Sequence, residues 1–484
     1  MEVFVKRPIL ALLFFAGAEL SFGAVINVPT EQPAIQAAID AAIDGDTVLV
    51  ADGHYFERLN LLAKSLLITS EILLDNDTSH IANTIIDADT NVIGASDTGS
   101  VIYAWGYPEY NGPVEVRGFT LQSGVGGGEG CVKAWLSDMT IRHCSIAGNS
   151  GVAKIGNGTH LTFDSTAIRD CPAGVDAANS YALSCRFTAC TLDSIPMCFH
   201  GCDVYFTSCI ANGCYISAYS TTWPIGMSIE SSLLRQCDIN LAIDGRLEIS
   251  NSEIYELDLS VRAFLVDVEN SIVTGEMTFN DFQSWWLSAT NSTFIGDIIH
   301  DLQSASHGSG YITLVNSVFM TDSPRLFDCN DERVYTISAT CCDIVCGDSI
   351  WIDVQPPSTL DTSDVFFDDP LFCDNLVNDF RLSDLSPCLP GNNSCGVLIG
   401  ALGMGCGSPY VCGDADGSGV VDIDDAIYLI NYVYLSGPVP NPVSAGDVNC
   451  DSKIDLLDIV GIVNYIFRGG NAPCDANGDD VPDC

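Results

Sequence analysis

Basic residues are scarce in this chain of 484 residues. Lysine and arginine together number 18 against 63 aspartates and glutamates, which gives a formal charge of −45. That charge would repel the phosphates of nucleic acids and of anionic lipid surfaces, so neither is an expected partner. An acidic surface would bind a polyanionic sugar only through bridging cations. A polysaccharide partner is therefore expected to be neutral or bridged by metal ions.

Long apolar runs are also missing, apart from one near the amino terminus. Lys6 and Arg7 precede an apolar run over 9–18, and small residues follow around Ser21 and Gly23. This is the layout of a secretory signal, and the run is too short to span a bilayer. We expect residues 1–23 to be a signal peptide. The mature protein should then be secreted, extracellular or attached to the cell surface, with no membrane insertion.

The paired CxxC spacing of a structural zinc site is absent, although the chain has 22 cysteines. Cys144, Cys190 and Cys209 fall at one repeated position, where we expect them to act as small apolar core residues. Four other cysteines crowd into a closing segment rich in loops, where disulfides are expected. These four are Cys373, Cys388, Cys395 and Cys406. Their pairing does not follow from the sequence.

Helical periodicity is nearly absent between about residues 60 and 350, where short apolar-polar strands alternate with turns of Gly, Asn, Asp and Ser. One six-residue phrase recurs there eleven times, about 19 to 25 residues apart, which is the length of one β-solenoid coil. Its copies begin at Val116, Ile141, Phe163, Phe187, Phe206, Ile229, Ile249, Val268, Ala289, Leu314 and Ala339. A β-sandwich also has short strands, but it has no reason to keep one phrase in register. The phrase therefore favours a solenoid.

This register predicts how side chains stack. Equivalent residues of successive coils should lie about 4.8 Å apart. Four asparagines of the phrase should then form an internal amide ladder at a turn, with four serines stacked beside them. The asparagines are Asn251, Asn270, Asn291 and Asn316, and the serines are Ser252, Ser271, Ser292 and Ser317.

An open solenoid end exposes strand edges, so both ends need a cap. At the start, the pattern predicts an amphipathic helix over Pro33–Ile43, a turn at Gly45 and Asp46, and a strand over Thr47–Val50. With the repeated phrase, this segment resembles the right-handed parallel β-helix family, the pectin-lyase-like superfamily. The run from Asp368 resembles the last coil and cap of its exported bacterial members. The resemblance covers roughly 24–406 and implies an all-β fold of about a dozen coils and work on polysaccharides.

Candidates for such chemistry lie at one outward position of the phrase. Arg117, Arg142 and Asp164 occupy it in three successive coils. Stacked basic and acidic groups can bind a uronate carboxylate and abstract a proton, as a polysaccharide lyase requires. The alternative is a surface ladder of ion pairs. The catalytic signatures of the pectin methylesterases and polygalacturonases are missing, so two hypotheses stand: a polysaccharide lyase or hydrolase, and a non-catalytic glycan-binding or surface-structural solenoid. Tryptophans that could stack on sugar rings are Trp105, Trp135, Trp285 and Trp286.

Two acidic segments near the carboxyl end have the pattern of calcium-binding loops, each followed by a helix. Calcium takes oxygen ligands from loop positions 1, 3, 5, 7, 9 and 12, with a turn at position 6. The first set of ligands is Asp414, Asp416, Ser418, the Val420 carbonyl, Asp422 and Asp425. The second is Asp447, Asn449, Asp451, the Lys453 carbonyl, Asp455 and Asp458. Gly419 stands at the first turn and Ser452 at the second, so the second loop should be the more strained.

Apolar residues recur at helical spacing after each loop, so each helix should have a buried face. In the first copy these are Ile427, Leu429, Ile430 and Val433, and in the second Ile459, Ile462, Val463 and Ile466. Position 12 is Asp rather than Glu, and no helix pattern precedes either loop. With the duplication and with Tyr432 and Tyr465, these features make 413–470 resemble the type I dockerin module.

That resemblance implies folding on calcium and docking to a cohesin. In that family loop positions 10 and 11 help to choose the partner. Here they are Ile423 and Asp424 in one copy and Leu456 and Leu457 in the other, so the two copies are not equivalent. A linker over 407–412 precedes the module, and an acidic tail over 471–484 follows it. The tail, with Asp475, Asn477, Asp479 and Asp483, either binds calcium or is simply solvated.

Overall fold

The computed structural model describes most of the chain between residues 23 and 473. The described residues are 23–61, 64–89, 99–106, 113–125, 130–177, 183–219, 225–242, 245–262, 265–280, 284–301, 309–324, 326–329, 334–347, 352–354, 358–406, 412–418, 420–435, 437–440, 443–449, 453–469 and 473. The predicted signal up to residue 22, the linker over 407–411, and the tail from Asp475 lie outside them. So do Gly419, Asp451 and Ser452 of the calcium loops.

The chain is a parallel β-solenoid of about 14 turns with a small helical region at its carboxyl end. Two compact units divide it: residues 1–248 with 258–263, and residues 249–257 with 264–484. Among the residues described, none of the helices has the length and apolar character needed to cross a membrane.

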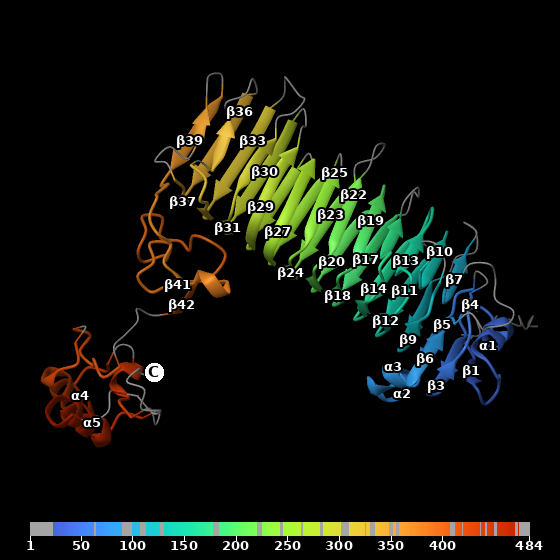
Figure 1. Ribbon diagram of the computed structural model, residues 1–484, viewed down its shortest axis with the longest axis horizontal. Coiled ribbons are helices and arrows are strands. Elements are labelled where there is room, and N and C mark those ends of the chain that lie inside the picture. The colour runs from blue at the N-terminus through green and yellow to red at the C-terminus, as the bar shows by residue number, and fades with distance from the viewer. Residues whose placement is uncertain are drawn as a thin grey trace, which may run out of the picture. The chain divides into compact units, whose positions relative to one another are not determined.

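In the first unit, one parallel sheet takes one strand from each coil, and β11, β14, β17 and β20 run side by side (Figure 1). Its strands are β1 (Val25–Val28), β2 (Thr47–Val50), β5 (Leu67–Ser70), β8 (Val114–Arg117), β11 (Asp138–Arg142), β14 (His160–Asp164), β17 (Ser184–Thr188), β20 (Asp203–Thr207) and β23 (Gly226–Glu230). β26 (Arg246–Ser250) follows and ends in the second unit. The phrase is in register, since Val116 pairs with Ile141, Ile141 with Phe163 and Phe163 with Phe187.

The other coil sides of the first unit form a second sheet. It contains β3 (Gly53–Tyr55), β4 (Leu59–Asn60), β6 (Thr84–Asp87), β7 (Ile102–Trp105), β9 (Thr120–Gln122), β10 (Val132–Trp135), β12 (Ser145–Ala147), β13 (Ala153–Ile155), β15 (Ala167–Arg169) and β16 (Val175–Ala177). It continues through β18 (Thr191–Asp193), β19 (Pro196–His200), β21 (Ile210–Asn212), β22 (Tyr215–Tyr219), β24 (Leu233–Arg235), β25 (Asp238–Ala242) and β27 (Glu253–Arg262). In the first sheet, Phe163 of β14, Phe187 of β17 and Phe206 of β20 are buried and stack, with ring centroids 5.2 and 5.0 Å apart.

The amino-terminal cap is the helix α1 (Ile35–Ala41), slightly shorter than predicted. Both of its ends are held by side chains from the next coil. The Glu57 carboxylate accepts hydrogen bonds from the amides of Ile35 and Gln36, at 2.9 and 2.8 Å. The Lys64 ammonium donates to the carbonyls of Ile39, Asp40 and Ala42 at 2.7 to 2.9 Å. Two short helices, α2 (Ile72–Asp75) and α3 (Ser79–Asn83), were not predicted.

The second unit continues the same coil pattern. One sheet holds β28 (Leu265–Glu269), β30 (Ser284–Thr290), β33 (Ser309–Val315), β36 (Val334–Thr340) and β39 (Thr359–Ser363), and another side holds β29 (Ile272–Asn280), β31 (Thr293–Ile295), β32 (Ile298–Asp301), β34 (Val318–Met320) and β37 (Asp343–Val345). Two small sheets pair β35 (Phe327–Cys329) with β38 (Ile352–Val354), and β40 (Phe372–Asp374) with β41 (Asp379–Ser383) and β42 (Met404–Cys406). A short 3₁₀ helix, η1 (Asn375–Val377), lies between β40 and β41.

The asparagine ladder is confirmed, but its predicted internal position is wrong. Side-chain amides form the ladder. Nδ2 of Asn270, Asn291 and Asn316 each donates to Oδ1 of the asparagine one coil before, at 3.4, 3.0 and 3.1 Å. All four asparagines have φ near +50°, a conformation that Asn tolerates better than most residues. Asn251 and Asn270 are exposed, and Asn291 and Asn316 are half-buried. The following serines point inward instead, with at most 2% of their surface exposed.

Cysteines divide as expected between core and closing segment. Cys144, Cys190 and Cys209 are buried free thiols. In the closing segment the disulfides join Cys341 to Cys395 and Cys373 to Cys406, while Cys388 stays a buried thiol. The prediction of bridges there therefore holds for three of the four cysteines, and Cys341 of the last phrase is the partner that the sequence did not reveal.

Candidate functional site

The first calcium loop brings three carboxylates together. Oxygens of Asp414, Asp416 and Asp425 lie within 4.8 Å of one another. Asp414 is 5% exposed and Asp425 is fully buried, whereas Asp416 faces solvent. Buried anions repel one another and lose hydration, so such a cluster is costly unless a cation neutralises it. All three are loop positions at which calcium takes a carboxylate oxygen.

Hydrogen bonds hold the first loop in a closed shape. The amide of Ser418 donates to Oδ1 of Asp414 at 2.9 Å and to Oδ1 of Asp416 at 3.0 Å. The Ser418 hydroxyl lies 3.2 Å from the Val420 carbonyl oxygen. The residues at loop positions 1, 3, 5 and 7, which are predicted ligands, are therefore neighbours in the structure.

The position-12 carboxylate ties the start of the loop to the start of the helix α4 (Ile423–Leu435). Asp425 accepts hydrogen bonds from the amide of Asp416 at 3.0 Å and from the amide of Asp422 at 2.8 Å. Burial raises the pKa of Asp425 above its ordinary value. A carboxylate in the first turn of a helix is favoured by the helix dipole, and a bound cation would stabilise its charged form further.

The second loop repeats this arrangement before the helix α5 (Leu456–Arg468). Asp458 is fully buried and accepts hydrogen bonds from the amides of Val448, Asn449 and Asp455 at 2.8, 3.2 and 2.7 Å. Asp455 caps the helix by accepting from the Leu457 amide at 2.7 Å. Burial raises the pKa of Asp458 as well.

The residues present fit calcium. Both position-12 carboxylates are buried and face loop backbone, and the first loop adds two more carboxylates within reach. Of the predicted ligands, the structure describes Asp414, Asp416, Ser418, Val420, Asp422 and Asp425 in the first loop, and Asp447, Asn449, Lys453, Asp455 and Asp458 in the second. A bound calcium ion would supply charge neutralisation and a crosslink between each loop and its helix.

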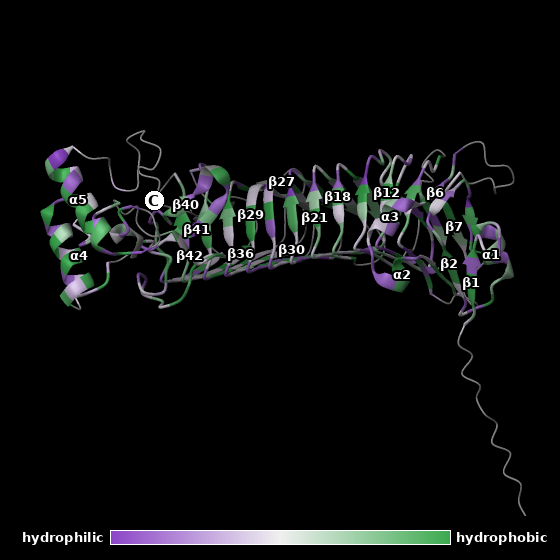
Figure 2. Cartoon of the chain, turned by 90° about the horizontal axis from the view of Figure 1, so that it is seen from below, coloured by the Kyte–Doolittle hydropathy of each residue, from purple (hydrophilic) through white to green (hydrophobic). Residues whose placement is uncertain are grey.

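The helices α4 and α5 pack through equivalent residues of the two copies. Their buried core is Ala415, Ala426, Leu429, Val448, Ile459 and Ile462, with Val433, Val463 and Ile466 packed against it. The predicted face of α5 is confirmed. On α4, Ile427 and Ile430 are 49% and 40% exposed, so this half of the predicted face is wrong. Ala426 takes the inward position, which is equivalent to that of Ile459 in α5. Figure 2 shows both helices with apolar and polar stretches.

Apolar residues also remain on the outside at equivalent positions of the two helices. Ile423, Ile427 and Tyr434 of α4 correspond to Leu456, Val460 and Phe467 of α5, and all six are 42% to 65% exposed. These two sets are called here the α4 stripe and the α5 stripe. The connection between the helices contains the short 3₁₀ helix η2 (Val443–Gly446).

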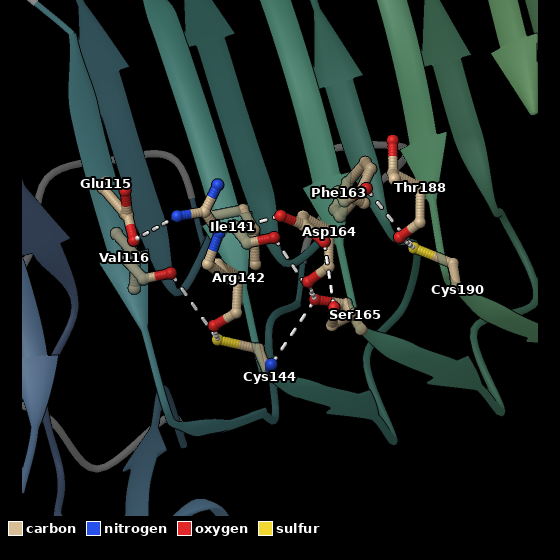
Figure 3. Close-up of polar contacts among 11 residues, drawn as sticks. Glu115, Val116, Ile141, Arg142, Cys144, Phe163, Asp164, Ser165, Thr188 and Cys190 are labelled. Atoms are coloured by element: carbon tan, nitrogen blue, oxygen red, sulfur yellow. Dashed lines mark hydrogen bonds and ion pairs between the residues drawn. The ribbon is translucent and has the colours of Figure 1, made fainter. Parts of the chain in front are cut away.

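The predicted groove residues lie in one column on the outer face of the first unit's sheet. Arg142 pairs in register with Arg117 on β8 and with Asp164 on β14. Its Nε donates to Asp164 Oδ2 at 2.8 Å, and its NH1 lies 3.4 Å from Glu115 Oε1 (Figure 3). The Ser165 hydroxyl also donates to Asp164, at 2.9 Å. Nε of Arg117 is buried without a hydrogen bond among the described residues.

This geometry places Arg142 between two carboxylates. The Asp164 carboxylate accepts hydrogen bonds from both Arg142 and Ser165, which are the contacts of a structural ion pair. Glu115 was missed by the sequence analysis. The signal was available: it stands two residues before Arg117, and side chains two apart on a strand share one face.

Comparison with known protein families identifies a domain in the region of α4 and α5. A family model described as the dockerin type I domain matches residues 412–467. Among curated proteins, none matches this chain. The carboxyl-terminal module is therefore a dockerin type I domain, and dockerin domains bind cohesins.

Proposed function

We propose that this chain is an exported, polysaccharide-associated β-solenoid that joins an extracellular complex by calcium-dependent docking of its dockerin domain on a cohesin. The observation that carries the proposal is the duplicated loop and helix, in which the buried Asp425 and Asp458 close two loops with calcium ligand order. The solenoid is consistent with a polysaccharide partner, since its fold resembles that of pectin-lyase-like proteins.

The α5 stripe is the cohesin contact that the structure favours. Exposed apolar side chains on a small domain mark interaction surfaces. Both stripes present three equivalent apolar residues, but loop position 11 is Leu457 beside the α5 stripe and Asp424 beside the α4 stripe. Leu457 is 59% exposed and extends the apolar surface, whereas Asp424 would lose hydration in an apolar interface.

Binding of the full chain to immobilised type I cohesin domains, with calcium or with a chelator, tests this assignment. Val460→Asp should weaken binding at least ~10-fold, because it buries a charge in the interface. Ile427→Asp is the matched change on α4 and should have a smaller effect. Equal binding with and without calcium would overturn the docking proposal. The reverse order of the two variants would move the contact to α4.

Catalysis by the solenoid remains the alternative. It requires Asp164 to act as a base near Arg142, and the contacts of Asp164 favour a structural ion pair. Incubation of the chain with a panel of pectic and other polysaccharides, followed by detection of unsaturated or reducing ends, separates the two hypotheses. If product is released and Asp164→Asn abolishes the release, the solenoid is an enzyme and the non-catalytic hypothesis is rejected.

A further inference from the structure

The two short helices α2 and α3 form an insertion over 72–83, which follows β5 at the amino-terminal end of the coils (Figure 1). Of these described residues, only Ile72 is buried. The Ile81 carbonyl accepts a hydrogen bond from the Thr120 hydroxyl of β9 at 2.7 Å. Helices of four and five residues are unstable by themselves, so contacts other than apolar packing must hold this insertion on the coils.

Three side chains with metal-ligating atoms meet beside the insertion. Asp52 follows β2, Glu71 directly precedes α2, and His80 lies in α3. One ligand atom of each residue, two carboxylate oxygens and a ring nitrogen in all, lies within 4.8 Å of the others. Nδ1 of His80 is 2.6 Å from Oδ1 of Asp52. The His80 side chain is only 13% exposed, so the cluster is partly withdrawn from water.

Hydrogen bonding explains only part of this cluster. His80 lies between two carboxylates, because its Nε2 is 3.4 Å from Oδ2 of Asp75 while its Nδ1 faces Asp52. The Glu71 carboxylate has no hydrogen bond or ion pair with any described residue, although it is the third negative group at this place. Three carboxylates around one imidazole repel one another, and a bound divalent cation would relieve that repulsion.

We propose that Asp52, Glu71 and His80 bind a divalent transition-metal ion, with zinc as the best fit, which crosslinks the insertion to the segment between β2 and β3. Zinc accepts an imidazole nitrogen together with carboxylate oxygens, whereas calcium takes oxygen ligands alone. Ligands held at about 2 Å from one tetrahedral zinc ion lie ~3.3 Å from one another. Small rotations of the three side chains give that spacing.

Neighbouring side chains orient two of the three ligands. A metal-bound histidine commonly donates its other ring N–H to a carboxylate, which fixes the ring and its tautomer. Asp75 takes this place at Nε2 of His80, so that Nδ1 is the nitrogen presented to the ion. The Thr84 hydroxyl at the start of β6 is 3.2 Å from Oδ1 of Asp52 and holds that ligand.

The same unit contains a histidine and carboxylate pair without a third ligand. Nε2 of His54 is 3.0 Å from Oδ2 of Asp87, which also accepts a hydrogen bond from Gln122 at 2.7 Å. Among the described residues, no set of three metal-ligating groups includes His54. His54 is therefore the matched control. The dockerin loops contain no histidine, and excess calcium keeps them filled during the test.

The test measures zinc binding to the full chain by isothermal titration calorimetry in excess calcium. Asp75→Asn should weaken zinc binding ~10- to 100-fold, as loss of the carboxylate behind a ligating histidine does. Glu71→Gln should weaken it at least as much, because it removes a charged ligand while breaking no hydrogen bond of the described residues. His54→Gln should leave zinc binding unchanged. Zinc affinity that Glu71→Gln and Asp75→Asn both leave intact overturns the site.

Hydrogen exchange measured by mass spectrometry gives the second readout. Zinc should slow exchange in 72–83 in the unmodified chain and in His54→Gln but not in Glu71→Gln, with β20 unchanged. Equal protection of β2 and β5 in all variants without zinc checks that they are folded. Calcium that protects 72–83 as strongly as zinc does, each ion tested alone, overturns the transition-metal assignment. Zinc binding that leaves exchange in 72–83 unchanged overturns the crosslink.

Discussion

Asp343 is a carboxyl group that the last coils and the closing segment bury completely. It accepts hydrogen bonds from the Asp368 amide at 3.2 Å and from the Cys388 thiol at 3.3 Å. Loss of hydration is the main cause that raises its pKa to about 7, and the nearby carboxylates of Asp368 and Asp369 add to the effect. A neutral, hydrogen-bonded acid therefore anchors the closing segment at mildly acidic pH.

The raised pKa predicts a pH-dependent stability. Because the folded protein holds this proton more tightly than the unfolded chain, the contribution of Asp343 is complete below about pH 4 and is lost as pH rises through about 7. Asp343→Asn removes the cost of ionisation and should stabilise the protein at pH 8 by up to ~4 kcal/mol relative to wild type. Denaturant unfolding at pH 5 and pH 8 measures the gap, which should shrink at pH 5. The exposed Asp361→Asn is the control, and a gap that is the same at both pH values would contradict the explanation.

For single residues, the sequence predicted contacts between equivalent positions of successive coils. It predicted contacts between the coils and the closing segment less well. The asparagine ladder followed from the phrase because coil stacking converts a sequence interval into a distance. The direction of those side chains did not follow, because it depends on the positive φ at each turn. Cys341 could not be paired with Cys395, since the bridge depends on how the closing segment folds back.

Among the elements, α1 shows that a capping helix can depend on residues outside its own segment for stability. Its first residues have no side-chain cap of their own, and Glu57 and Lys64 from the following coil bind its two ends. The sequence predicted α1 from its apolar spacing but not these contacts, which are distant along the chain. For α4 the spacing was ambiguous, because isoleucines occur on both sides and only packing against α5 selects Ala426 and Leu429.

The capping contacts predict a local effect of Lys64→Met. The methionine keeps the apolar stem but removes three hydrogen bonds from an ammonium to carbonyls at the helix end, which should cost ~1–3 kcal/mol. Hydrogen exchange measured by mass spectrometry should show faster exchange in α1 and in β1, with little change in β20. Arg169→Met, which replaces a side chain that is 63% exposed, serves as the control. Unchanged protection of α1 would show that the three contacts do not stabilise the cap.

At the scale of the whole molecule, different interactions are expected to stabilise the solenoid and the dockerin domain. Each coil buries apolar residues against its neighbours and pairs its backbone with them, so we expect its stability not to depend on calcium. Among its described residues, the dockerin domain has a small core of six buried residues, next to two loops rich in carboxylates. A domain of that size commonly needs a metal to offset its chain entropy. Unfolding of the full chain is therefore expected to occur in two separable steps.

Calcium removal tests this separation in the full chain. In chelator, peptides from α4 and α5 should lose protection from hydrogen exchange, because the repulsion among Asp414, Asp416 and Asp425 is no longer neutralised. Peptides from β11, β14 and β33 should keep theirs. Asp414→Ala combined with Asp447→Ala should abolish the calcium response, since position 1 of both loops is lost. Asp361→Asn, an exposed carboxylate of β39, should preserve it. Protection of both helices that is independent of calcium in the unmodified chain would contradict the metal assignment, and loss of protection in β11 would show that the solenoid also depends on the ion.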